Sequence, residues 1–146
     1  MVHATRVMTD PLDPDDQLGY LLVRAADRAS RRWHAALRAH RINPRQFSVL
    51  ALLARDPGLS QAELARRVLI TPQSMSESLV GLIDAGHLTR DEIEPGRPAR
   101  LRLTEAGRAL LDTAYPVVKA SDRDVFAALT DRDRAELGRI LRTLLD

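Results

Sequence analysis

The chain has 146 residues, of which 45% are apolar, and this length and composition predict one globular domain rather than a disordered chain. The absence of cysteine excludes disulfides, thiolate zinc sites and Fe–S clusters. The formal net charge is +2, and every Lys or Arg residue except Lys119 is an arginine. Because arginine binds phosphate in a bidentate geometry, this composition weakly favours a nucleic-acid partner. No run of about 18 apolar residues and no signal-peptide core occurs, so we expect a soluble, cytoplasmic protein with no membrane partner.

The first part of the chain predicts a tail followed by a long amphipathic helix. Residues 1–12 show no periodicity and are expected to form a flexible N-terminal tail. Asp13-Pro14 gives an N-cap followed by a proline, which predicts that the helix begins there. Apolar residues recur at spacings of three and four from Leu18 to Leu37 and form one stripe. A stripe of this length needs a large surface to pack against.

Three shorter helices are predicted between residues 43 and 86, because three amphipathic runs each follow a capping residue. A turn of three residues joins the last two, which is the arrangement of a helix-turn-helix. The caps are Asn43-Pro44, Ser60 with Glu63, and Thr71-Pro72, and the ends are marked by Asp56-Pro57-Gly58, Arg67 and Gly86.

The segment from Leu88 to Leu103 predicts a β-hairpin, or wing, because it is extended and is interrupted by Pro95-Gly96. On its return strand we expect one of Arg100 and Arg102 to lie inward and to cover the core with its aliphatic stem.

Two helices end the chain. Thr104 caps a helix that is expected to run towards Leu129, and Thr130 with Asp133 forms a capping box for a last helix. The apolar residues of the last helix, up to Leu145, form a second stripe. The predicted fold class is therefore mainly α, with six helices and a small β-hairpin: a winged helix-turn-helix.

The helix opened by Thr71-Pro72 is the candidate recognition helix, because short polar side chains occupy its first two turns. Its only charged residues up to Ala85 are Glu77 and Asp84, so the helix is net negative and the attraction for DNA must come from residues around it. Gln73 suits adenine and Glu77 suits cytosine. The base-reading candidates are Thr71, Gln73, Ser74, Ser76 and Glu77.

Arginines surround this helix in the sequence. Arg97, between Gly96 and Pro98, is the candidate for insertion into a narrow minor groove, and we expect it to contribute most to the affinity. The other DNA-binding candidates are Ser60, Gln61, Arg66, Arg67, Arg90 and Arg100.

Other classes of function are poorly supported by the sequence. It contains no glycine-rich phosphate loop and no His-Glu-x-x-His, so we expect no enzyme and no cofactor. His34 and His40 are six residues apart and do not share a helical face, so a zinc site is not expected. The acids between Asp10 and Asp16 lack the pattern of a calcium loop.

Four segments together resemble the MarR family of bacterial transcriptional regulators. They are Leu-Ser-Gln-Ala-Glu-Leu-Ala at 59–65, Thr-Pro-Gln-Ser at 71–74, Leu-Ile-Asp-Ala-Gly-His-Leu at 82–88 and Leu-Arg-Leu-Thr-Glu-Ala-Gly at 101–107. The order of six helices, with the wing between the fourth and the fifth, is similar to that family over nearly the whole chain.

The resemblance implies a homodimer in which the first, fifth and sixth helices interlock, which would explain the two apolar stripes. It implies one domain at 13–146, with dimerisation helices at 13–42 and 105–146 and a DNA-binding lobe at 43–104. It also implies a ligand-responsive repressor of a pseudo-palindromic operator, released by a small aromatic or phenolic acid. Candidate ligand-binding residues are Trp33, Leu37, Phe47, Leu50 and Tyr115, with Arg41 or Arg45 facing a carboxylate.

Two features depart from the family pattern. Family recognition helices often carry Arg where this chain has Glu77, so the bases read there are not carried over. In place of reading a base, Glu77 is an alternative candidate for bracing Arg97 or another wing residue. The acid that commonly precedes the wing-tip arginine is missing from Gly96-Arg97-Pro98.

Two alternatives stay open. The Gly-Arg-Pro wing followed by Leu-Thr-Glu-Ala-Gly also resembles PadR-type regulators, although the long first helix and the two C-terminal helices favour MarR. The acidic recognition helix keeps open a helical interaction module that has lost DNA binding.

Overall fold

The computed structural model describes residues 13–91, 96 and 99–146, so the expected tail at 1–12 lies outside the described residues. The described parts contain six α-helices and a two-stranded antiparallel sheet, which is the predicted architecture. In chain order the elements are η1 (Pro14–Asp16), α1 (Leu18–Leu37), η2 (Arg38–His40), α2 (Pro44–Arg55), α3 (Gln61–Val68), α4 (Pro72–Asp84), β1 (Leu88–Asp91), β2 (Arg100–Leu103), α5 (Glu105–Val125) and α6 (Asp131–Leu145).

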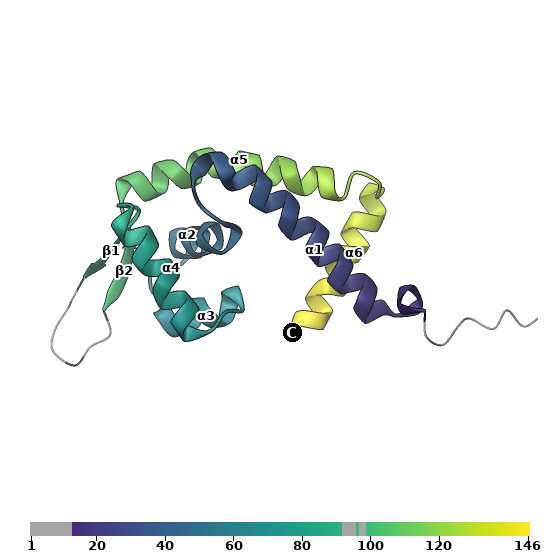
Figure 1. Cartoon of the computed structure of the whole chain (residues 1–146), viewed down its shortest axis with the longest axis horizontal. Helices are drawn as coiled ribbons and strands as arrows, with labels where there is room; N and C mark the ends of the chain where they lie inside the picture. Colours follow the sequence, from purple (N-terminus) through teal and green to yellow (C-terminus); the bar gives the residue numbers. More distant parts are fainter. Residues whose placement is uncertain (1–12, 92–95, 97–98) are drawn as a thin grey trace, which may run out of the picture.

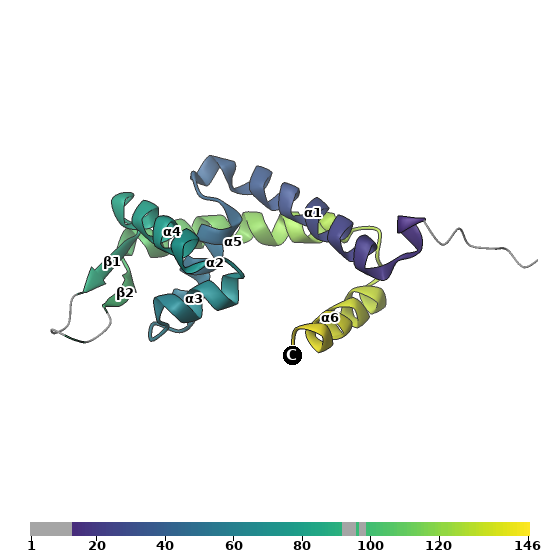
Figure 2. The ribbon, with the colours of Figure 1, turned by 60° about the horizontal axis from the view of Figure 1, so that its bottom comes forward.

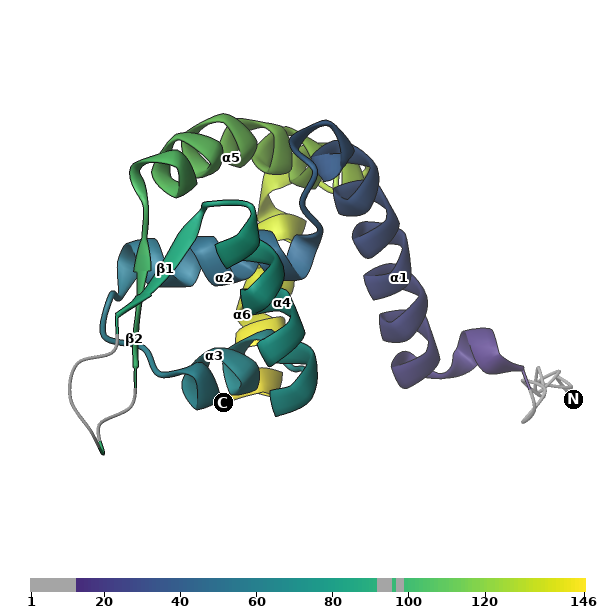
Figure 3. The ribbon, with the colours of Figure 1, turned by 60° about the vertical axis from the view of Figure 1, so that its left-hand side comes forward.

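Helix α5 connects the two ends of an elongated molecule. Figure 1 shows α5 along the upper edge, with α2, α3, α4 and the hairpin gathered below its first half. Helix α1 packs along α5, and α6 turns away at the far end (Figure 2). In Figure 3 the hairpin lies beside α2 and α4, in agreement with the contacts of α2 with β2 and of α4 with β1.

The first helix does not begin where the sequence predicted. The Asp13 side chain accepts a hydrogen bond from the Asp15 N–H at 2.9 Å, but this cap opens only the single 3-10 turn η1. Gln17 then adopts an extended backbone with ψ 118°, so α1 starts anew at Leu18. The prediction of one continuous helix from Asp13 was therefore wrong, because the extended residue separates the cap from the amphipathic stripe.

The predicted caps of the later helices are confirmed. Asn43 with Gln46, Ser60 with Glu63 and Thr130 with Asp133 form reciprocal capping boxes, and Thr71 and Thr104 cap α4 and α5. Helix α5 ends at Val125, earlier than the expected end near Leu129, because residues 126–128 form a turn and residue 129 a bend.

The core lies entirely in the winged lobe and in the part of α5 and α1 that covers it. In the single chain α6 has no buried residue, and α1 has only Ala29 and Leu37. The buried apolar cluster consists of Leu37, Ile42, Val49, Leu50, Leu53, Leu59, Leu64, Ala65, Met75, Leu79, Leu82, Leu88, Leu101 and Ala114.

The first turn of α5 meets the turn between α4 and β1 at very close range. Thr104 N–H donates to the His87 carbonyl at 3.1 Å, and the Thr104 hydroxyl donates to the Gly86 carbonyl at 2.6 Å. A Cβ atom on Gly107 would lie 2.1 Å from the same His87 oxygen, so only glycine permits this approach. This joint fixes α5 against the end of α4 and the start of the wing.

Candidate nucleic-acid interface

The turn between α3 and α4 is closed by a residue in an unusual conformation. Leu69 caps α3 with φ 58° and ψ 46°, and its N–H donates to the carbonyls of Ala65 and Arg66. A non-glycine residue rarely adopts this left-handed region, and here the leucine side chain is 83% exposed. Sequence reasoning missed this residue, because only the abrupt end of the α3 pattern before Thr71 indicates a cap there.

The first turns of α4 carry the predicted base-reading side chains on an accessible surface. Thr71 accepts from the Ser74 N–H at 3.1 Å, and its hydroxyl donates to the Ser74 hydroxyl at 3.0 Å, so these two side chains serve largely as the helix cap. Gln73 and Glu77 are exposed and one helical turn apart, so they share a face. In the part of the chain that the structure describes, Glu77 forms no ion pair.

Two side-chain hydrogen bonds through Gln61 connect α3, α4 and the wing. The Gln61 Nε2 donates to the Ser76 hydroxyl at 2.7 Å, and Arg90 Nη2 donates to Gln61 Oε1 at 3.2 Å. Gln61 and Ser76 are half-buried, whereas Arg90 is exposed on β1. Three predicted DNA-binding residues from three elements are thus brought together.

Arg66 and Arg67 lie exposed in the last turn of α3, and with Glu63 they line a shallow depression. The Ser60 hydroxyl accepts from the Glu63 N–H at 3.2 Å, and the Ser60 N–H donates to the Glu63 carboxylate at 2.7 Å. The hydrogen bond from the Ser60 N–H to the carboxylate is the largest cause that lowers the pKa of Glu63 below its ordinary value of 4.5, and the Ser60 side chain and the charges of Arg66 and Arg67 lower it further.

The lowered pKa of Glu63 predicts an acid-sensitive start of the helix-turn-helix. Because folding lowers this pKa, the stabilisation is fully present above about pH 4.5 and is lost as the pH falls through the folded-state value. We expect Glu63→Gln, which takes up no proton and can still accept from Ser60, to lose less stability on acidification than the wild type. Urea unfolding of both proteins across the acid range measures this, and parallel losses would contradict it.

The wing is a four-residue antiparallel ladder in which Leu88 pairs with Leu103 and Asp91 with Arg100. Leu101 is buried, whereas Arg100 and Arg102 are both exposed, so the expectation that one arginine lies inward was wrong. The pleat places residues two apart on one face, and here the leucines occupy the inner face. Gly96 has φ 92°, a conformation that suits a tight turn. Arg97 lies outside the described residues.

The wing contains an ion pair that the sequence reasoning did not find. Asp91 on β1 lies 2.6 Å from the Arg102 Nε on β2. The sequence did offer a signal for this pair, because a hairpin centred on the predicted break at Pro95-Gly96 pairs residue 91 with residue 100. The observed register places Asp91 opposite Arg100 and diagonal to Arg102. This pair connects the two strands of the hairpin.

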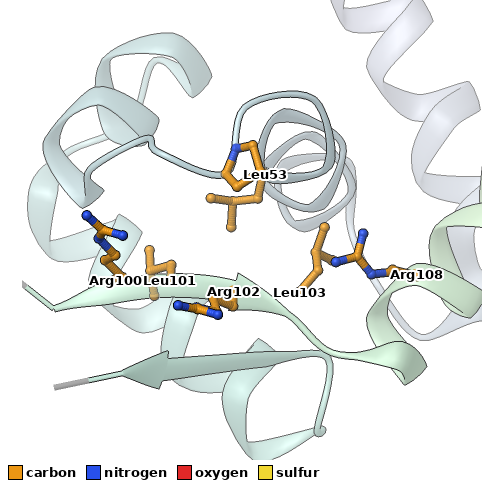
Figure 4. Close-up of a pocket in the computed structure, with 7 residues that line it drawn as sticks. Leu53, Arg100, Leu101, Arg102, Leu103 and Arg108 are labelled. Carbon is orange, nitrogen blue, oxygen red and sulfur yellow. The ribbon is translucent and has the colours of Figure 1, made fainter. Parts of the chain in front are cut away.

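A pocket of about 340 Å³ lies between the end of α2, strand β2 and the start of α5 (Figure 4). Its lining combines apolar side chains with three arginines, and includes none of the seven predicted ligand-binding residues. The residues that line it are Leu53, Pro57, Arg100, Leu101, Arg102, Leu103 and Arg108.

The predicted ligand-binding residues occupy the junction of α1, α2 and α5. Phe47 stacks on Tyr115 with ring centroids 6.4 Å apart, and Tyr115 is 56% exposed. The indole Nε1 of Trp33 is buried and has no hydrogen-bond partner among the described residues. Leu37 and Leu50 have no exposed surface in the single chain and belong to the core.

The two cations predicted to meet a ligand carboxylate, Arg41 and Arg45, are exposed. Arg41 adopts a left-handed conformation with φ 56° after η2, and Arg45 lies in the first turn of α2. The ligand-binding set stays a prediction.

Within the described residues, no helix combines the length and the apolarity needed to cross a membrane.

Comparison with known proteins identifies relatives over nearly the whole chain. The MarR family model matches residues 42–98, which favours MarR over the PadR-type alternative. The HTH-type transcriptional repressor Rv2887 of Mycobacterium tuberculosis is 40% identical over 134 residues, covering 91% of this chain and 96% of the relative.

Two solved structures of DNA complexes share the fold. The Mycobacterium tuberculosis MarR family protein Rv2887 in complex with DNA has a TM-score of 0.73 at 40% identity, covering 88% of this chain and 97% of that one. The transcriptional repressor CouR bound to a 23-mer DNA duplex has a TM-score of 0.83 at 30% identity, covering 90% of this chain and 94% of that one. On this similarity over nearly its full length, the chain belongs to the MarR family of winged helix-turn-helix transcriptional regulators.

Proposed function

We propose that the chain is a cytoplasmic transcriptional repressor that binds a pseudo-palindromic operator as a homodimer and is released by a small aromatic acid. It has no catalytic role in this proposal. The observation that carries it is the charge arrangement of the lobe: an accessible polar helix α4 without cations, flanked by exposed arginines of α3 and the wing. Relatives named as repressors support the same function.

Two recognition helices related by a two-fold axis would enter successive major grooves, so the half-sites would lie about 10 bp apart. Residues 43–104 would form the DNA-binding lobe, and residues 13–42 and 105–146 the dimerisation helices. The exposed leucines of α1 and α6, such as Leu22 at 46% and Leu144 at 66%, are the surfaces expected to meet in the dimer.

The effector would bind beside the junction of α1, α2 and α5. Phe47 and Tyr115 offer aromatic faces, Trp33 offers an indole N–H without a partner among the described residues, and Arg41 or Arg45 would face the carboxylate. A structure of Rv2887, 40% identical to this chain, contains salicylic acid, which makes salicylate the first compound to test.

The test is binding to duplex DNA from the region upstream of the chain's own gene, measured across a salt series. We expect specific binding whose logarithm falls linearly with the logarithm of salt concentration. Arg100→Ala removes one phosphate contact per protomer, so the affinity falls and the slope becomes shallower by about 2 per dimer. Salicylate added at one salt concentration should release the duplex.

Arg132→Ala is the matched control, because it removes the same charge from an exposed position in the first turn of α6. It should leave the slope unchanged. Weak binding of every duplex, equal in the wild type and in Arg100→Ala, would argue against the repressor and in favour of the interaction module.

A further inference from the structure

Gln61 occupies a position that links the recognition helix to the wing. It is the first residue of α3, and both polar atoms of its side-chain amide form hydrogen bonds. The nitrogen bonds Ser76 on α4 and the oxygen bonds Arg90 on β1. Ser76 is 15 residues away along the chain and Arg90 is 29 residues away. The three side chains therefore form a bridge across elements that are distant in sequence.

The chemistry of Arg90 fixes the direction of this bridge. A guanidinium donates hydrogen bonds and accepts none, so the Gln61 atom that faces it must be the carbonyl oxygen. The amide nitrogen then faces Ser76, and the Ser76 oxygen accepts from it. The Ser76 hydroxyl hydrogen consequently stays available as a donor, while Arg90 keeps the majority of its five N–H donors for other partners.

We propose that Gln61 is a positioning residue: it sets Arg90 and Ser76 for DNA and acts through them rather than by its own contact with the duplex. The inference rests on the proposed function of the lobe. Because α4 contains no lysine or arginine, a cation tied to it by hydrogen bonds gives this helix a fixed electrostatic partner on the wing. Ser76 would present a donor, which suits phosphate oxygens and base acceptors and disfavours the cytosine amino group.

The folding of α3 does not depend on this bridge. The capping box of Ser60 and Glu63 holds the start of the helix, and Leu64 and Ala65 anchor it in the core. Gln61→Met keeps a side chain of similar length and removes both hydrogen bonds. Its effect on thermal stability should therefore be small, which separates positioning from a purely structural role.

The test is a double-mutant cycle on affinity for the duplex that the wild type binds. Alone, Gln61→Met should weaken binding by about tenfold, because a hydrogen bond to a charged group and its orientation are lost. In an Arg90→Ala, Ser76→Ala background, the same change should cost less than about twofold, because the groups that Gln61 positions are absent. The unfolding temperature should stay near that of the parent protein in both backgrounds.

Gln73→Met is the matched control, since Gln73 is exposed on α4 and is expected to meet DNA directly. Its cost should be the same in the wild type and in the Arg90→Ala, Ser76→Ala background. An equal cost of Gln61→Met in the two backgrounds, or no cost in either, would overturn the inference. Failure of the wild type to bind any duplex specifically would instead overturn the proposed function, so the two failures are distinguishable.

Discussion

Replacing Leu144 by Asp is expected to dissociate the dimer and to abolish operator binding. Leu144 is 66% exposed in the single chain, so a carboxylate there costs the folded protomer little. In the dimer each protomer would bury one such carboxylate, and an unpaired buried charge costs several kcal/mol. The dimer dissociation constant should therefore rise by at least about a hundredfold. A monomer presents one recognition helix and loses the second half-site.

Sedimentation equilibrium over a range of concentrations measures this change, together with binding to the full operator and to a single half-site. Leu69→Asp is the control for dimerisation, because Leu69 is 83% exposed but lies in the turn between α3 and α4. The control should sediment as a dimer. A dimer of unchanged affinity in Leu144→Asp would show that α6 lies outside the interface and that the apolar stripe of α1 needs another partner.

Local signals explain why so much of the fold was predictable from the sequence. Each capping box joins residues three apart, such as Ser60 with Glu63, so the start of a helix is specified by a few neighbouring residues in the sequence. The hairpin follows from the alternation of leucine and arginine along the return strand and from Gly96, which adopts a positive φ because it has no Cβ atom. The error at Asp13 has the same origin, because a local cap signal cannot tell whether the helix continues beyond Gln17.

The features that could not be predicted depend on how distant segments meet. The bridge from Ser76 through Gln61 to Arg90 requires the angle between α3, α4 and β1, which no sequence spacing reports. The exposure of Arg102 depends on which face of the hairpin packs against the core. Helix α2 packs against the face that carries the leucines, so Arg102 is exposed on the other face. For the interface, the sequence therefore offered candidate residues but did not indicate which of them hold one another in place.

Gly107→Ala is expected to destabilise the protein strongly, because the added methyl group has no room. Its carbon would lie 2.1 Å from the His87 carbonyl oxygen and 3.0 Å from Leu103 Cδ2, and the first of these neighbours is backbone that cannot swing aside. Relief requires α5 to move away from the turn, which weakens the hydrogen bond from Thr104 N–H to His87. We expect a loss of about 3 kcal/mol, at the upper end of the range for overpacking.

This loss should lower the unfolding temperature by roughly 6–12 °C, measured by calorimetry at equal protomer concentration. Gly81→Ala is the matched control, because its nearest neighbour is the end of the flexible Gln46 side chain at 3.4 Å and alanine favours the helix. The control should be unchanged or more stable. If Gly107→Ala unfolds at the wild-type temperature, the first turn of α5 shifts freely, and the winged lobe would not be rigidly fixed to the helix that carries it.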